Sequence, residues 1–116
     1  MGSVAIIAWF GMYVHNVADL PGLTILSPEN AGPTLVWVAV FAVWWLLPDR
    51  RWPTVAILAW GWVNLIGGAL SVLPIGLSPF SPEQTMYHYS FHGLYAACQV
   101  PLLRVGHAQL RARHAA

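Results

Sequence analysis

Three histidines and one aspartate have the residue types and the spacing of a metal site. His15 and Asp19 are four residues apart in the sequence, and His88 and His92 have the same separation. Residues at positions i and i+4 share one face of an α-helix, so each pair can direct two ligand atoms to the same side. Imidazole and carboxylate groups bind Zn²⁺, and imidazole also suits copper and iron. The sequence therefore predicts a transition-metal site formed by His15, Asp19, His88 and His92.

The same side chains admit interpretations without a metal. His88 or His92 could act as a general base toward a substrate, because imidazole titrates near neutral pH. Asn64 and Tyr89 are expected to supply polar groups around the site. Interhelical hydrogen bonds such as His15–His88 or Asn64–His92 would instead hold helices together with no ligand at all. The His-Glu-x-x-His motif of zinc metalloproteases is absent from the sequence.

The composition indicates the environment in which these residues are held. The chain has 116 residues, of which 58% are hydrophobic, 13% are aromatic and 8% are charged. Globular proteins carry about 25% charged residues, and a soluble domain of this size leaves much of its surface in water. Disordered chains are polar and poor in aromatic residues, which excludes that class. A net charge of +1 without any lysine argues against nucleic-acid binding. The sequence therefore predicts an integral membrane protein in contact with a lipid bilayer.

Four segments are apolar over the length that a membrane-spanning helix requires, about 20 residues. They cover residues 4–20, 28–47, 53–73 and 82–103. The connections between them are short, which predicts one domain, an all-α bundle of four transmembrane helices. A basic tail is expected over residues 104–116. Pro101 is expected to kink the last helix or to end its regular hydrogen bonding.

The arginines set the expected orientation of the bundle. They all fall between the second and third segments or after the fourth: Arg50, Arg51, Arg104, Arg111 and Arg113. The opposite side carries Asp19, Glu29 and Glu83. Positively charged residues are retained in the cytoplasm. Both termini are therefore predicted to be cytoplasmic, with the two longer loops outside.

The histidine pairs are predicted to meet in the outer half of this bundle. His15 and His88 each lie six residues from the nearest outer proline, which places both about 9 Å inside the outer helix ends. Asn64 and His92 each lie ten residues from such a proline, at a depth of about 15 Å. Short connections make the first and last helices neighbours. The four predicted ligands should then converge in an outward-facing chamber with Asn64 at its floor.

A haem or chlorophyll macrocycle is a second cofactor that these histidines could bind. His15 and His88, at equal predicted depth, could serve as its axial ligands. Gly11 lies one helical turn before His15 and would leave room for a flat ring. No glycine or alanine precedes His88 or His92 at that spacing. A single metal ion is therefore the favoured interpretation, with a macrocycle as the minor one.

The two outer loops resemble each other. Residues 27–29 and residues 81–83 both read Ser-Pro-Glu, and each triplet immediately precedes an apolar segment. Two helical hairpins in the same orientation, related by a pseudo-twofold axis, would explain this internal repeat, and such repeats occur in transporters. Helix capping explains the same residues without a duplication, since Ser favours the N-cap, Pro the first turn and Glu the positive helix end. Both interpretations stay open.

Three classes of function fit these observations. The first is a small membrane protein with an outward-facing His/Asp metal or cofactor site, either an accessory subunit of a larger complex or a homo-oligomer, because the chain is too short for a separate catalytic domain. The second is a membrane enzyme that uses histidine as acid and base on a lipid or quinone-like substrate. The third is a small transporter. Transport is disfavoured because a proton-coupled exporter needs a carboxylate at membrane depth, whereas Asp19 lies at the outer end of the first segment.

Overall fold

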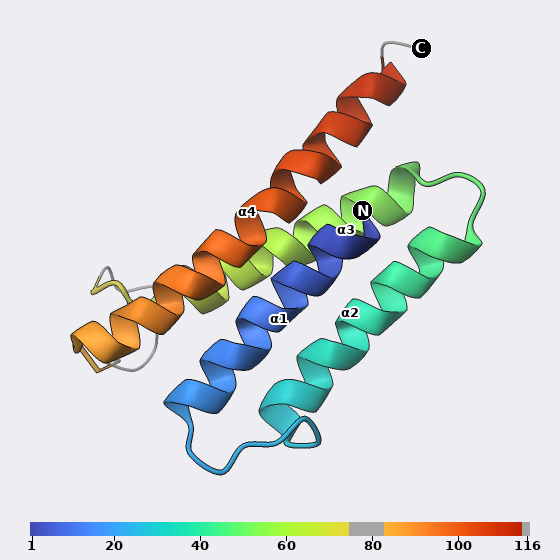
Figure 1. The fold of residues 1–116 in the computed structure, drawn as a ribbon. Coiled ribbons are helices and arrows are strands. Elements are labelled where there is room, and N and C mark those ends of the chain that lie inside the picture. The colour runs from blue at the N-terminus through green and yellow to red at the C-terminus, as the bar shows by residue number, and fades with distance from the viewer. Residues whose placement is uncertain (75–82, 115–116) are drawn as a thin grey trace.

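All the regular secondary structure in the part of the chain that the structure describes is helical. This computed structural model describes residues 1–74 and 83–114. In chain order the elements are α1 (Gly2–Asp19), α2 (Pro28–Leu46), α3 (Arg51–Val63), the π-helical turn η1 (Asn64–Gly68), the 3₁₀ turn η2 (Ala69–Val72) and α4 (Met86–His114). No strand occurs among these residues. The prediction of an all-helical fold with four main helices is therefore confirmed (Figure 1).

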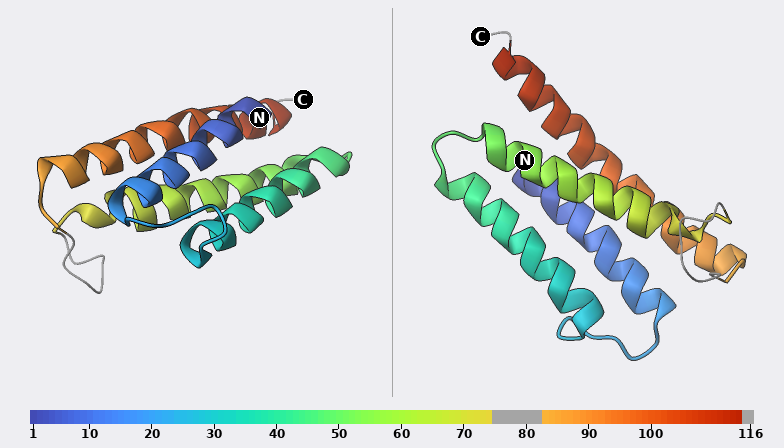
Figure 2. Two further views of the ribbon diagram at one scale, coloured as in Figure 1. Left: turned by 60° about the horizontal axis from the view of Figure 1, so that its bottom comes forward. Right: turned by 180° about the vertical axis from the view of Figure 1, so that it is seen from behind.

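The four helices lie side by side, and each packs mainly against two others. Helix α1 packs against α2 and α4, and α3 packs against the same two helices (Figure 1). The further views show that the C-terminal turns of α4 extend beyond the N-terminus of α1 (Figure 2). As expected from the short connections, the first and last helices are neighbours. This contact brings the two predicted histidine pairs together.

Small residues and one buried amide hold α4 closely against α1. A Cβ atom on Gly11 of α1 would lie 2.5 Å from the Cβ atom of Cys98 on α4, so glycine is required for this approach. Nearby, the fully buried Gln99 donates a hydrogen bond from Nε2 to the carbonyl oxygen of Ala8, at 2.9 Å. These contacts fix the axial position of α4 relative to α1.

The third helix changes geometry at the level of the candidate site. Helix α3 continues into the π-helical turn η1 and then into the 3₁₀ turn η2, and π-helical turns are frequent at functional sites. A Cβ atom on Gly68 would lie 2.7 Å from the Tyr95 ring of α4, so this glycine makes room for that side chain. Carbonyl groups in the last turn of a helix have no N–H partner four residues on. The carbonyl oxygen of Ala69 can therefore accept a hydrogen bond from a side chain of α4.

Helix α4 extends past the predicted crossing of residues 82–103 into the predicted basic tail. Helix α4 runs through Pro101 and continues to His114. Proline removes one backbone hydrogen bond from a helix. The two following residues, Leu102 and Leu103, are 0% and 5% exposed, and their burial offsets that loss. The C-terminal turns also reach the connection between α2 and α3, where Arg113 Nη1 lies 3.7 Å from Asp49 Oδ1.

Among the described residues, one helical stretch has the length and apolar composition that a membrane crossing requires. It is Arg51–Val72, which joins α3 to the two short turns that follow it. The other described helices miss this criterion because they carry polar residues, among them His15 and Asp19 in α1 and Glu29 in α2. The predicted set of four crossings is not confirmed by this criterion and rests on the sequence.

The predicted duplication of a helical hairpin stays a prediction. In the first outer loop, Ser27 occupies the N-cap position of α2 and Pro28 is the first residue of the helix, as the capping interpretation predicts. The Ser27 hydroxyl, however, accepts a hydrogen bond from the N–H of Thr24 and does not cap the helix. In the second loop, residues 81 and 82 lie outside the described residues. The two helices that a repeat would relate have 19 residues in α2 and 29 in α4.

Candidate metal site

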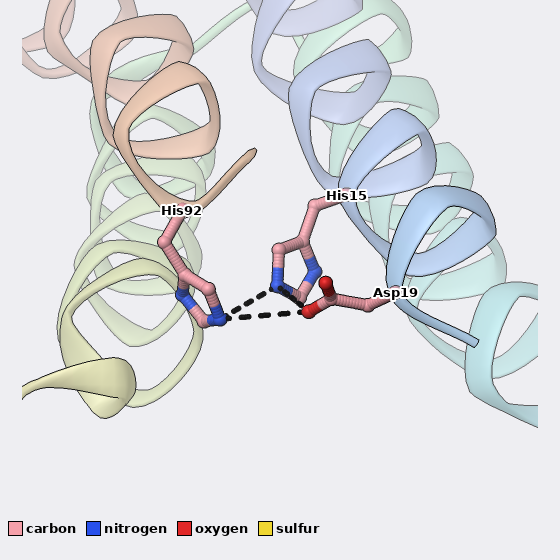
Figure 3. A group of neighbouring side chains, drawn as sticks. All are labelled: His15, Asp19 and His92. Carbon is pink, nitrogen blue, oxygen red and sulfur yellow. Dashed lines mark hydrogen bonds and ion pairs between the residues drawn. The ribbon is translucent and has the colours of Figure 1, made fainter. Parts of the chain in front are cut away.

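Three of the four predicted ligands converge on one point between α1 and α4. His15 Nε2 lies 3.0 Å from Asp19 Oδ2 and 2.8 Å from His92 Nε2, and His92 Nε2 lies 3.7 Å from the same carboxylate oxygen. Figure 3 shows the three side chains pointing toward one another, two from α1 and one from α4. Their ligand atoms all lie within 4.8 Å of one another. These three residues could therefore hold one metal ion.

The start of α4 determines which histidine faces His15. The residues before Met86 that the structure describes are not helical, and Thr85 Oγ1 accepts a hydrogen bond from the N–H of His88 at 3.2 Å. A threonine in this place satisfies a free N–H of the first turn. The helix thus begins four residues, or about one turn, after the proline from which its depth was predicted. As a result His92, and not His88, lies level with His15.

The backbone fixes the protonation of His92. Its Nδ1 atom lies 2.8 Å from the carbonyl oxygen of Ala69, in the last turn of the third helix. A carbonyl oxygen only accepts hydrogen bonds, so Nδ1 carries the proton of the neutral ring. The Nε2 atom then holds a lone pair, and this is the atom that faces His15 and Asp19.

A chain of amides fixes the protonation of His15 in the same way. Asn30 Nδ2 donates to the carbonyl of Thr24, and Asn16 Nδ2 donates to the carbonyl of Glu29 and to Asn30 Oδ1. These bonds orient the Asn16 amide so that its Oδ1 faces His15 Nδ1, at 3.0 Å. An amide oxygen only accepts, so His15 Nδ1 carries the proton and Nε2 holds a lone pair.

Three acceptor atoms therefore face one another at short range. They are the Nε2 atoms of His15 and His92 and Oδ2 of Asp19, separated by 2.8 to 3.7 Å. Lone pairs at these distances repel each other unless a positive charge lies between them. The arrangement requires either an additional proton or a bound cation at this point.

His88 contacts the aspartate from the other side. Its Nδ1 lies 2.9 Å from Asp19 Oδ1, so it holds the oxygen that does not face His15 and His92. Outer partners of this kind orient the ligands of metal sites. The Nε2 atom of His88 is buried and has no hydrogen-bond partner among the described residues. The structure therefore places His88, predicted as a direct ligand, where it orients Asp19.

The predicted polar neighbours lie in two different places. Asn64 is buried, and its Oδ1 accepts a hydrogen bond from the Tyr95 hydroxyl at 2.6 Å instead of contacting His92. The Tyr95 ring lies 5.3 Å from the His15 ring, between centroids, so this pair forms the floor of the cluster. The Tyr89 hydroxyl donates its hydrogen bond to Gln84 Oε1. Tyr95 was missed, although it lies three residues after His92 on the same helix face.

A cleft gives access to the cluster. Its volume is about 410 Å³, and it is lined by all four predicted ligands together with Leu20, Ser71, Glu83 and Tyr87. The side chains of His15, Asp19 and His88 are 13%, 9% and 15% exposed. The cluster is thus mostly shielded, but a small ligand can reach it.

The macrocycle stays a prediction, and the Asp19 carboxylate occupies the space between its two proposed axial ligands. The rings of His15 and His88 lie 6.4 Å apart between centroids. The Asp19 carboxylate lies between them, 3.0 Å from His15 Nε2 and 2.9 Å from His88 Nδ1. A flat ring would have to displace this carboxylate and break both contacts. The donor set suits a single ion.

Comparison with known proteins identifies neither a family nor a function for this chain. No protein-family model, curated protein or solved structure matches the chain.

Proposed function

We propose that this chain is a small integral membrane protein that binds one transition-metal ion at its outer side. His15, Asp19 and His92 are the proposed ligands, and His88 is the residue that orients Asp19. Zinc, copper and iron all accept imidazole nitrogen. Three protein ligands leave a further coordination position, which the adjoining cleft of about 410 Å³ makes accessible to a small molecule.

The observation that carries the proposal is the convergence of acceptor atoms. Metal-bound histidines usually donate their other N–H to a carbonyl or carboxylate group, which fixes the tautomer and aims the lone pair at the metal. His92 does so toward the carbonyl of Ala69, and His15 toward Asn16 Oδ1. Zinc–nitrogen distances of about 2.0–2.1 Å put two nitrogens of a tetrahedral site roughly 3.3 Å apart. The present 2.8 Å separation would open by about half an ångström.

Exposed apolar surface supports the membrane setting. Phe10 on α1, Leu35 on α2 and Trp62 on α3 are 54%, 67% and 42% exposed, and many other large apolar side chains are also exposed. Monomeric soluble proteins rarely expose apolar patches of this extent. A bilayer, or other membrane helices in a complex, would cover them. The protein should stay in the membrane fraction after a carbonate wash, and its release into the wash would contradict this setting.

Metal binding is tested directly by titration. Protein purified in detergent is stripped with a chelator and titrated with Zn²⁺, Cu²⁺ or Fe²⁺, with bound metal measured by mass spectrometry. We expect one ion per chain, and we expect His92→Ala to lower the affinity by about 100-fold or more, since removing even an outer partner costs 10–100-fold. Tyr89→Phe, on the same helix but outside the cluster, should bind as the wild type does. A folded wild-type protein that binds none of the three ions would overturn the proposal.

One observation also favours a second function, acid–base catalysis on a small substrate. The Nε2 atom of His88 is buried, lacks a hydrogen-bond partner among the described residues, and belongs to a side chain that lines the cleft. A carboxylate only accepts hydrogen bonds, so His88 Nδ1 carries the proton that faces Asp19, and Nε2 holds a lone pair that could accept a proton from a bound molecule. An enzyme of this kind would lose turnover in His88→Gln while still binding its metal. Equal turnover by the wild type and His88→Gln would exclude this role.

A further inference from the structure

A second cleft lies between α3 and the C-terminal half of α4, lined by residues that do not belong to the metal cluster. Its volume is about 490 Å³. Apolar side chains of α3, η1 and α4 line one part of it, among them Trp62, Leu65 and Val100. Basic side chains of α4 line the rest: Arg104, His107 and Arg111. We call this cleft the basic groove.

The three basic residues form a stripe on one helix face. They occupy positions i, i+3 and i+7 of α4, a spacing that places side chains on the same side of a helix. Arg104 and Arg111 are separated by about 10 Å along the helix axis at 1.5 Å per residue. The stripe runs along α4 toward the end where the arginines of the sequence gather.

The positive charge of this stripe is not balanced within the described residues. Arg104 and Arg111 are exposed and form no ion pair there, and the groove is lined by no acidic residue. Arg113, on the same helix but outside the groove, differs from these two arginines because its Nη1 lies 3.7 Å from Asp49 Oδ1. Two unpaired guanidinium groups on one helix face, lining a groove without acidic residues, favour a bound anion, because Arg presents a planar set of donors to phosphate.

His107 adds a third donor to the stripe. The indole N–H of Trp62 points to His107 Nε2 at 3.4 Å, and the two rings lie 6.4 Å apart between centroids. The indole nitrogen only donates, so His107 Nε2 accepts and its Nδ1 carries the proton. This contact connects the apolar part of the groove to its basic part.

We propose that the basic groove binds an anionic phospholipid. The phosphate would contact Arg104, His107 and Arg111, while an acyl chain would cover Trp62 and Val100, which are 42% and 45% exposed. A phospholipid carries both chemistries in one molecule, whereas a free anion would leave the apolar part uncovered. Basic pockets between membrane helices on the cytoplasmic side bind anionic headgroups in this manner. The proposal rests on the membrane setting proposed above, but not on the metal.

Native mass spectrometry of the full chain in nanodiscs tests the proposal. The nanodiscs contain phosphatidylcholine alone or mixed with phosphatidylglycerol, and the lipids retained by the protein are counted. We expect the wild type to retain phosphatidylglycerol in preference to phosphatidylcholine. Arg104→Gln with Arg111→Gln should lower that retention about 25-fold, from roughly fivefold for each arginine near a membrane surface. Arg113→Gln removes one positive charge from the same helix outside the groove and should change retention little, whereas Arg104→Gln alone should lower it about fivefold.

Several outcomes would overturn the proposal. Equal retention by the double variant and the wild type would show that the groove does not hold the lipid. A loss of retention in Arg113→Gln as large as in the double variant would show that only the overall positive charge of the helix matters. Displacement of phosphatidylglycerol by inorganic phosphate would identify a free anion as the occupant, and a mass of two chains without lipid would identify a second copy. Circular dichroism checks that the double variant is folded, and Arg104→Lys with Arg111→Lys should recover part of the retention. Metal titration of the same samples and the carbonate wash report separately on the proposed function.

Discussion

The contact between α1 and α4 has two halves that are built differently. Toward the end of α1 the helices meet through polar side chains, with His15 and Asp19 facing His92 at 2.8 to 3.7 Å. Toward the middle of α1 they meet through small residues, with Gly11 against Cys98. The polar half contains unfavourable lone-pair contacts that a cation would relieve, whereas the small-residue half is held by close packing and by the hydrogen bond from Gln99 to Ala8. Substitutions in the first half should therefore change ligand affinity, and substitutions in the second should change stability.

The largest effect is expected for Asp19→Asn. The carboxylate is the only acidic ligand of the proposed site and is also the partner of His88. Its loss should reduce metal affinity by more than about 100-fold, beyond the 10–100-fold that outer partners contribute. Isothermal titration with the preferred metal measures the change. Glu29→Gln removes a carboxylate at the start of the neighbouring α2 and serves as the matched control. Equal metal affinities for Asp19→Asn and the wild type would show that Asp19 is not a ligand.

A pair of glycine substitutions tests the small-residue half. Gly11→Ala places a Cβ atom 2.5 Å from Cys98 Cβ, whereas a Cβ atom on Gly93 of α4 meets nothing within 4 Å. Overpacking costs about 1–3 kcal/mol, while Ala in a helix interior gains up to about 1 kcal/mol over Gly. Gly11→Ala should therefore lower the thermal unfolding midpoint in detergent and Gly93→Ala should leave it equal or higher. A lower midpoint for Gly93→Ala than for Gly11→Ala would contradict this packing.

A smaller effect on affinity is expected for His88→Ala. His88 holds Asp19 Oδ1 and is not among the three groups that converge on one point. The loss of such a partner should lower metal affinity by about tenfold, toward the small end of the effect of outer partners. The same titration measures it. A loss as large as that of His92→Ala would mean that His88 is a direct ligand, as its spacing from His92 first indicated.

The sequence specifies the helices and the ligand types well, because both follow from local patterns. Apolar segments bounded by proline gave helices within a few residues of the observed bounds for α1, α2 and the third helix. Spacings of four residues correctly paired His15 with Asp19 on one helix face. The short connections correctly made α1 and α4 neighbours, so the residues that gather at the site were identified before their geometry was known.

The depth of each ligand could not be obtained from the same patterns. The predicted depth of each histidine assumes that the last helix begins at position 82, whereas α4 begins at Met86. This difference of about one turn places His92, instead of His88, opposite His15. Axial position depends on tertiary contacts such as Gly11 with Cys98, which no local pattern contains. The partner of His92 is a backbone carbonyl, that of Ala69, so no residue type could indicate it.

The smallest effect is expected where α1 and α4 share a single buried hydrogen bond. Gln99 is fully buried and donates to the carbonyl of Ala8, but its own Oε1 has no partner among the described residues. Gln99→Leu removes one bond worth about 1 kcal/mol and also removes a buried unpaired oxygen, whose cost is of similar size. The unfolding midpoint should therefore change little, whereas Gln99→Ala should lower it by leaving a cavity. Because the site lies two turns away on α4, Gln99→Leu should also keep the metal affinity of the wild type. A large loss of affinity in this variant would show that the two halves of the α1–α4 contact are coupled.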